Sequence, residues 1–305
     1  MKVFITGING QVGYEAANIL AARGHTVYGS GRSENYRGLT LDERAQYLPL
    51  DITDREAVLN RLGELQPDVV IHCAAWTAVD AAEAPENLNA VRMTNVTGTE
   101  NIARACQQCC SKMVYLSTDY VFNGKGTEPW EPDEKGFAPL NVYGQSKLDG
   151  EKAVSSILRQ FFIVRTAWVF GANGNNFVKT MLRVGSTHAQ VRVVSDQIGT
   201  PTYAKDLARL LSDMIETDCY GYYHATNEGG YISWYDFCCE IYRQAGLKTE
   251  IIPVTTEEYG LSAAARPFNS RLDRRKLAEK GFQPLPAWQD ALSRYLEEIG
   301  EKENT

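Results

Sequence analysis

The sequence lacks an apolar run of membrane-spanning length, a signal-peptide pattern at its start and any low-complexity tract. It also lacks an excess of positive charge, because 31 Lys and Arg stand against 38 Asp and Glu, which gives a net charge of −7. These absences argue against a membrane protein, a disordered chain and a nucleic-acid binder. We expect a cytoplasmic protein with no membrane or nucleic-acid partner. A few Arg or Lys residues could still hold an anionic small molecule.

Spacings typical of metal sites are also missing. The chain has seven Cys and four His. Cys106, Cys109 and Cys110 form a CxxCC run, but no second pair stands at metal-site spacing, so we expect reduced, packed thiols. His72 and His224 lie in apolar runs and are expected to be core residues with satisfied hydrogen bonds. The sequence therefore predicts no metal site.

What the sequence does contain is a regular alternation of strand-length apolar runs with amphipathic helix patterns. Helix patterns cover Val12–Ala22 and roughly Pro85–Cys109. The apolar runs are Val3–Thr6, Thr26–Gly29, Val69–Cys73, Met113–Ser117 and Phe161–Thr166. Such alternation predicts an α/β fold, a Rossmann-type doubly wound parallel sheet. After it the rhythm loosens, with short strands at Gly221–Thr226 and Glu250–Pro253, which indicates a smaller C-terminal α/β lobe.

A glycine-rich loop follows the first predicted strand and opens the first helix. It reads Gly7-Ile8-Asn9-Gly10-Gln11-Val12-Gly13, a GxxGxxG variant of the GxGxxG dinucleotide pattern. Glycines allow a tight turn and close approach to a pyrophosphate, and the helix N-terminus favours negative charge. We therefore predict an NAD(P)-binding Rossmann domain over residues 1–165, with part of the later chain returning to it, and a mainly substrate-binding lobe over 166–305.

The end of the second strand bears on the choice of nicotinamide cofactor. It reads Ser30-Gly31-Arg32, without the carboxylate that would bind the ribose 2′-hydroxyl of NADH. Arg32 can pair with a 2′-phosphate, so NADPH is favoured and NADH is the alternative. Asp51, which is followed by Ile52, could accept a hydrogen bond from the adenine amino group, cap the next helix, or do both.

Tyr143 and Lys147 form a YxxxK pair, and residues four apart share one face of a helix. A nearby ammonium stabilises phenolate, so we expect a lowered Tyr143 pKa that suits proton exchange with a substrate oxygen. Thr118 and Asp119 end a strand-length run, where a doubly wound fold places its ligands. Thr118 could polarise a carbonyl, and Asp119 could orient substrate or water.

The glycine loop, the strand-end Thr and the YxxxK pair together resemble the extended short-chain dehydrogenase/reductase superfamily. Longer stretches resemble one family in it, the dTDP-4-dehydrorhamnose reductases, from residue 1 to about residue 295. These stretches are Gly10–Gly13, Ala74–Asp80, Ser117–Phe122, Arg165–Gly171, Asn176–Val178, Asp196–Thr202, Tyr223–Asn227 and Arg266-Pro267.

The resemblance implies reduction of the C4 carbonyl of dTDP-4-dehydro-6-deoxy-L-mannose to give dTDP-L-rhamnose. Catalytic positions would be Thr118, Asp119, Tyr143 and Lys147. Cofactor positions would be Gly7, Asn9, Gly10, Gln11, Val12, Gly13, Arg32, Asp51, Ile52, Ala74, Ala75, Tyr143 and Lys147. Substrate positions would be Thr118, Val121, Trp168, Asn176 and Arg266, with the Trp168 ring against the sugar. The resemblance also suggests a homodimer.

Two other functional hypotheses are compatible with the same fold. One is a related nucleotide-sugar enzyme, either another 4-ketoreductase or an epimerase, which would retain tightly bound NAD⁺. The other is a non-catalytic regulatory subunit that binds NADP(H). The intact set of Thr118, Tyr143 and Lys147 favours an enzyme.

Overall fold

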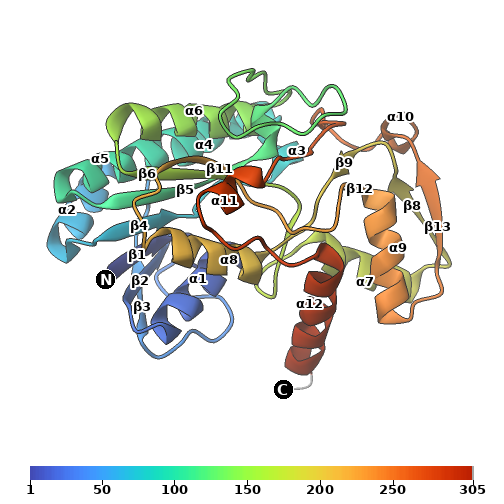
Figure 1. Ribbon diagram of the computed structural model, residues 1–305, viewed down its shortest axis with the longest axis horizontal. Helices are drawn as coiled ribbons and strands as arrows, with labels where there is room; N and C mark the ends of the chain where they lie inside the picture. Colours follow the sequence, from blue (N-terminus) through green and yellow to red (C-terminus); the bar gives the residue numbers. More distant parts are fainter. Residues whose placement is uncertain (304–305) are drawn as a thin grey trace.

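The computed structural model describes residues 1–303, with side chains through residue 300. A seven-stranded parallel sheet forms one half of it, on the left in Figure 1. The strand order is β11-β6-β5-β4-β1-β2-β3, and it reverses direction between β1 and β4. The strands are β1 (Lys2–Thr6), β2 (Thr26–Gly31), β3 (Ala45–Pro49), β4 (Val69–His72), β5 (Lys112–Thr118), β6 (Phe161–Thr166) and β11 (Gly221–His224). A crevice opens at the carboxyl edge where such an order reverses. The predicted Rossmann-type sheet is confirmed.

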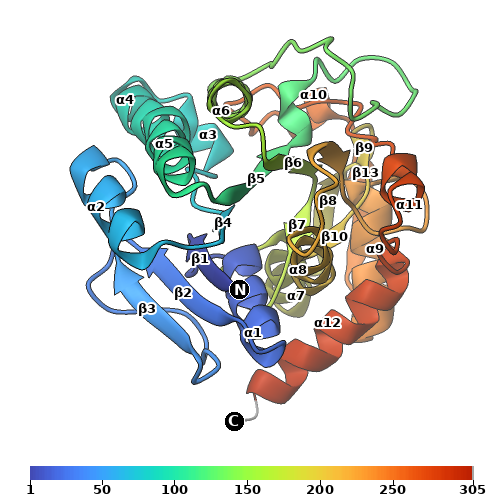
Figure 2. The same cartoon turned by 60° about the vertical axis from the view of Figure 1, so that its left-hand side comes forward.

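Helices cover both faces of this sheet (Figure 2). Helices α1 (Gln11–Ala22) and α8 (Ala204–Met214) pack on one face. Helices α2 (Arg55–Leu65), α5 (Thr99–Cys109) and α6 (Val142–Ile157) pack on the other. Along β1, Val3 and Ile5 face the first layer while Phe4 faces the second, and all three are fully buried. Burial on both faces explains why these strands appear in the sequence as nearly continuous apolar runs.

The chain between β4 and α5 is less regular than the sequence pattern predicts. It is divided into α3 (Val79–Ala82), the 3₁₀ turn η1 (Pro85–Asn87), α4 (Leu88–Arg92) and the π-helical turn η2 (Met93–Gly98). Asn95 in η2 is fully buried; its side chain accepts a hydrogen bond from the Trp76 amide (2.7 Å) and donates to the Ser146 hydroxyl (2.8 Å). A π turn inserts a residue into a helix and re-aims its side chains, often at functional sites.

The later chain adds a second, aromatic core beside the carboxyl edge of the sheet. Its fully or largely buried rings include Phe170, Tyr203, Phe237, Trp288 and Tyr295. Its helices are α7 (Phe177–Thr187), α9 (Trp234–Ala245), α10 (Thr256–Tyr259), α11 (Arg275–Glu279) and α12 (Trp288–Glu303). Its short strands pair as β7 (Val169–Phe170) with β10 (Thr202–Tyr203), β8 (Gln190–Val194) with β13 (Glu250–Val254), and β9 (Ile198–Gly199) with β12 (Ile232–Ser233).

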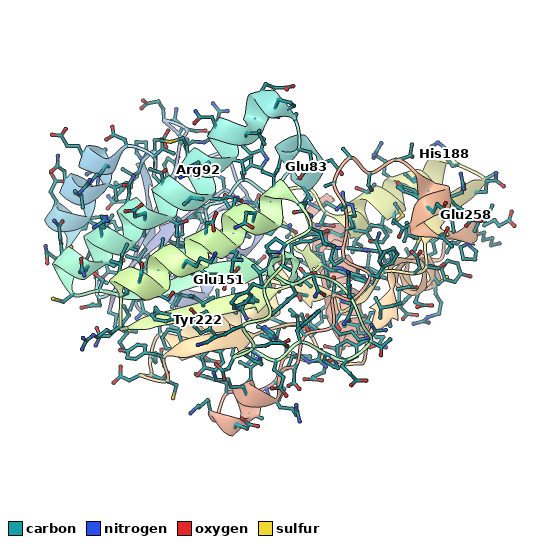
Figure 3. The ribbon with its side chains drawn as sticks, turned by 90° about the horizontal axis from the view of Figure 1, so that it is seen from above. Glu83, Arg92, Glu151, His188, Tyr222 and Glu258 are labelled. Carbon is teal, nitrogen blue, oxygen red and sulfur yellow. The ribbon has the colours of Figure 1, made fainter. Side chains whose placement is uncertain are left out.

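The later chain also contributes to the main sheet, because β11 pairs with β6 and α8 packs against α1. In Figure 3, Glu151 and Tyr222 mark the sheet end of the molecule, whereas His188 and Glu258 mark the other end. The predicted boundary at residues 165 and 166 stays a prediction. No helix within residues 1–303 combines the length and apolar character needed to cross a membrane.

Candidate active site

A cleft of about 780 Å³ lies at the carboxyl edge of the sheet. Residues that follow β1, β2, β4, β5 and β6 line it, and Trp168 and Trp234 close it from the side of the aromatic core. The strand-end position agrees with the general rule for ligands of doubly wound sheets. The cleft contains most of the residues predicted from the sequence.

The glycine loop forms one wall of this cleft, and two of its glycines admit no side chain. Gly7 has a positive φ of 71°, and a Cβ there would lie 2.6 Å from the Ala74 amide nitrogen. A Cβ on Gly13 would lie 2.5 Å from the Gly7 carbonyl oxygen. Gly10 occupies the N-cap of α1 without a side-chain cap. The first turn of α1 therefore presents backbone to the cleft, in the arrangement that binds a pyrophosphate. The predicted positions Gly7, Asn9, Gly10, Gln11, Val12 and Gly13 all line the cleft.

Arg32 stands between the cleft and a smaller adjoining hollow of about 400 Å³. Asp51 lies in the hollow and not in the main cleft, whereas Ile52 lines the cleft. The Asp51 carboxylate accepts hydrogen bonds from the Thr53 amide (2.9 Å) and hydroxyl (2.8 Å), and Asp54 is the residue that caps α2. Asp51 therefore shapes the turn before α2.

Ala74 and Ala75 follow β4 and line the cleft as predicted. The Thr6 hydroxyl, which lies within 2.7 Å of His72 Nδ1, accepts a hydrogen bond from the Ala74 amide. Burial lowers the pKa of His72 to about 3, so this ring is neutral at physiological pH. His72 thus serves as a buried hydrogen-bonding residue beneath the cleft, in line with the sequence expectation.

Thr118, Asp119, Tyr143 and Lys147 meet in the cleft. The Asn141 side chain caps α6 by accepting from the Gly144 amide (2.7 Å), which starts the helix next to Tyr143. Lys147 lies one turn later and donates to the Leu116 carbonyl (2.7 Å). The Thr118 hydroxyl donates to the Asp119 carboxylate (3.0 Å). Helix α6 and the end of β5 thus place a phenol, an ammonium and a hydroxyl around one space.

The protonation of these groups differs from the sequence expectation. Burial, reinforced by the Asp119 carboxylate, raises the pKa of Tyr143 instead of lowering it. Burial also lowers the pKa of Lys147 to about 7, although the Glu151 carboxylate opposes this shift. Desolvation of both groups, which the local sequence does not reveal, accounts for the difference. A raised pKa leaves Tyr143 protonated at neutral pH, which suits a proton donor.

Trp168 and Trp234 form a stacked pair at the far side of the cleft. Their ring centroids are 3.7 Å apart and their planes are tilted by 17°. Trp168 has a left-handed backbone with φ of 50°, a conformation that bulky residues rarely adopt and that often marks functional sites. Trp168 was predicted from the sequence, but Trp234 was missed. The Ser233 and Asp236 capping box that begins α9 was the available signal, because it fixes the position of Trp234.

The remaining predicted substrate positions do not line the cleft. Arg266 donates to the hydroxyl of Tyr120 (3.1 Å), a cleft residue whose ring packs edge-on against Tyr143. Asn176 caps α7 and donates to the Gly171 carbonyl (2.9 Å), and Val121 is fully buried in the core. Arg266 thus contacts a residue of the cleft wall without lining the cleft itself. Asn176 and Val121 lie behind the residues that line the cleft.

Comparison with known proteins shows which family the chain belongs to. The family described as "RmlD substrate binding domain" matches residues 1–301. The chain belongs to the RmlD family. This confirms the family resemblance inferred from the sequence.

Curated relatives of this RmlD-family chain match it over nearly its whole length. The dTDP-4-dehydrorhamnose reductase of Escherichia coli (strain K12) is 35% identical over 98% of both chains. The Streptomyces griseus protein of the same name is 38% identical over 95% of this chain and 91% of its own length. The spore coat polysaccharide biosynthesis protein SpsK of Bacillus subtilis (strain 168) is 39% identical over 97% of both.

A solved structure of a dTDP-4-dehydrorhamnose reductase shares the fold. The Bacillus anthracis dTDP-4-dehydrorhamnose reductase, determined in complex with NADP, aligns with a TM-score of 0.85 at 39% identity. That alignment covers 98% of this chain and all of the other.

Proposed function

We propose that this protein is an NAD(P)H-dependent reductase of the C4 carbonyl of dTDP-4-dehydro-6-deoxy-L-mannose, giving dTDP-L-rhamnose. The observation that carries the proposal is the meeting of Thr118, Tyr143 and Lys147 with the glycine loop in one cleft. Relatives named dTDP-4-dehydrorhamnose reductase, matched over nearly the full chain, support the same reaction.

The cleft residues fit a dinucleotide cofactor. The space in front of Gly7 and Gly13, which a Cβ would fill, lets backbone approach a pyrophosphate at the start of α1. NADPH is the favoured cofactor and NADH the alternative, because the residue directly after β2 is Arg32 and not a carboxylate. The Bacillus anthracis relative was determined in complex with NADP. When bound, the reduced nicotinamide supplies the hydride that adds to the sugar C4 carbon.

Tyr143 supplies the proton in this proposal. Its raised pKa keeps the phenol protonated until a developing alkoxide at the C4 oxygen accepts the proton, which completes the alcohol. The Thr118 hydroxyl, when its single proton turns from the Asp119 carboxylate to the substrate, polarises the same oxygen. Lys147, fixed by the Leu116 carbonyl, holds the cofactor ribose and stabilises the phenolate left behind. Asp119, whose pKa burial raises to about 6, orients the Thr118 hydroxyl.

The substrate side of the proposal uses a flat ring and a cation. Trp168 offers an apolar face to the C–H side of the sugar. Arg266 provides charge for the diphosphate. Asn176 and Val121 act indirectly, by capping α7 and by packing beneath the strand-end segment. A dTDP-sugar is the proposed partner, while a homodimer and a cytoplasmic location stay predictions.

The test follows nicotinamide absorbance after the protein is mixed with NADPH or NADH and the 4-keto sugar nucleotide. Tyr143→Phe removes the proton donor and keeps the ring, so we expect kcat to fall by roughly 10²–10⁴-fold. NADPH affinity should change little. Tyr231→Phe is the matched control, because the Tyr231 hydroxyl donates to the Leu272 carbonyl away from the cleft.

Each outcome distinguishes the readings. Stoichiometric loss of NADPH signal that Tyr143→Phe abolishes supports the reductase. Tightly held NAD⁺ after purification, without net consumption, would indicate an epimerase. Cofactor binding without turnover of any 4-keto sugar nucleotide would indicate the regulatory subunit. Near-normal turnover by Tyr143→Phe would remove Tyr143 as the acid.

A further inference from the structure

Asp80, on the short helix α3, accepts hydrogen bonds from a segment far away in sequence. Arg266 Nη2 donates to its carboxylate at 2.5 Å, and the Ala264 amide donates to it at 3.1 Å. The Arg266 side chain is 24% exposed and that of Asp80 is 46% exposed. We call residues 262–266 the strap. Asp80 thus holds the strap both by charge and by a main-chain hydrogen bond.

Three further hydrogen bonds fix the strap. Arg266 Nε donates to the Ser262 hydroxyl (3.2 Å), and Arg266 Nη1 donates to the Tyr120 hydroxyl (3.1 Å). The Asn141 side chain donates to the Ala265 carbonyl (2.8 Å) while it caps α6. The guanidinium is therefore held in one orientation beside a residue that lines the cleft.

Helix α3 also contacts the start of the helix that carries Tyr143. Glu83, the residue after α3, accepts a hydrogen bond from the Val142 amide (2.7 Å) and lies beside the first turn of α6 (Figure 3). A carboxylate there satisfies a helix N–H and complements the helix dipole. Asp80 and Glu83 thus tie the strap and the Tyr143 helix to the same short turn.

The Asp80 carboxylate could either weaken or help anion binding by Arg266. It offsets part of the positive charge, but it is half exposed and therefore partly screened by solvent. Arg266 has five N–H donors and uses three of them in the contacts above. An arginine already held in one rotamer loses less conformational entropy when it binds. Positioning should therefore outweigh charge neutralisation.

We propose that Asp80 is a positioning residue that aims Arg266 at the diphosphate of the sugar nucleotide and holds the strap against the Tyr143 helix. The inference rests on the proposed function and adds a residue to it. Asp80 touches neither the reacting atoms nor the nicotinamide, so its effect should appear in substrate binding and not in the chemical step.

The experiment measures KM for the 4-keto sugar nucleotide, kcat and the NADPH Kd for Asp80→Ala, Asp80→Asn, Arg266→Ala and the Asp80→Ala/Arg266→Ala double variant. We expect Asp80→Ala to raise KM about tenfold, with kcat and the NADPH Kd within about twofold of the parent. The KM of Asp80→Asn should lie between those of the parent and Asp80→Ala, because the asparagine amide oxygen still accepts a hydrogen bond from the Ala264 amide. The double variant should match Arg266→Ala, since Asp80 acts through Arg266.

Three results would overturn the proposal: an unchanged or lower KM for Asp80→Ala, effects of Asp80 and Arg266 that add fully, or an Arg266→Ala variant with the parent KM. In the last case the reductase assignment still stands or falls separately on Tyr143→Phe. Glu100→Gln, which removes an exposed ion pair with Arg104 on α5, is the control, and thermal unfolding of every variant reports on folding.

Discussion

The two halves of the cleft differ in whether backbone or side chains line them. The cofactor half is mostly backbone: the glycine loop, the end of β2 and the alanines after β4 leave space by lacking side chains. The sugar half is made of side chains from distant segments, including Tyr120, Trp168 and Trp234. Adding atoms to the cofactor half should therefore weaken cofactor binding, and removing atoms from the sugar half should weaken binding of the sugar nucleotide.

Adding one methyl group to the cofactor half should have the largest effect on ligand affinity. In Gly13→Ala the new Cβ would lie 2.5 Å from the Gly7 carbonyl oxygen, so the loop must shift. A shift that costs the loop about 3 kcal/mol of its contact with the cofactor raises the NADPH Kd about 100-fold. Fluorescence titration with NADPH measures this. The control is Gly63→Ala in α2, where a Cβ meets nothing within 4 Å and should stabilise the helix by about 0.5–1 kcal/mol. Equal NADPH affinity in both variants would contradict a backbone-made site.

This half was also the more predictable from sequence. Strands buried on both faces, such as β1 and β4, appear as apolar runs, and the glycine loop and YxxxK pair are local motifs whose spacing fixes their geometry. Prediction failed where tertiary contacts decide. The helix pattern over Pro85–Cys109 gives no sign of the π turn at Asn95, which depends on contacts with Trp76 and Ser146.

The sugar half was harder to predict for the same reason. Asn176 matches a family segment, but only the fold shows that its side chain caps α7 instead of facing the cleft. Trp234 belongs to the cleft because α9 begins next to Trp168, which no local spacing reveals. The raised pKa of Tyr143 follows from burial, and burial is a property of the packed structure.

Lys147 lies where the two halves meet, and its burial should appear in the pH dependence of stability. Burial lowers its folded-state pKa from 10.5 to about 7, so between these values the unfolded chain binds the proton that the folded chain releases. Stability from Lys147 is then fully present above pH 10.5 and is lost as pH falls from there through about 7, at up to about 1.4 kcal/mol per pH unit. Urea unfolding of the parent and Lys147→Met across this range measures the difference. The exposed Lys152 on the same helix, changed to Met, is the control. Parallel curves for the parent and Lys147→Met would refute the lowered pKa.

Removing a ring from the sugar half should have a smaller and more selective effect. Trp234 contacts Trp168 and Phe177, with centroid distances of 3.7 and 4.6 Å. In Trp234→Leu the left-handed Trp168 loses the ring that holds it, and an aromatic pair contributes about 0.5–1.5 kcal/mol beyond its buried area. We expect KM for the sugar nucleotide to rise up to about tenfold while the NADPH Kd stays unchanged.

A second signal separates this effect from general loosening. Two stacked indoles couple in the far-ultraviolet circular dichroism spectrum, so Trp234→Leu and Trp168→Leu should each remove the same band. Trp234→Phe restores a ring against Trp168 and should recover much of the parent KM without the band. Trp130→Leu is the matched control, because Trp130 stacks on Phe122 (4.8 Å) and does not line the cleft. If Trp234→Leu weakened NADPH binding as strongly as sugar binding, the two halves would be one cooperative unit, and the contrast between backbone-made and side-chain-made walls would fail.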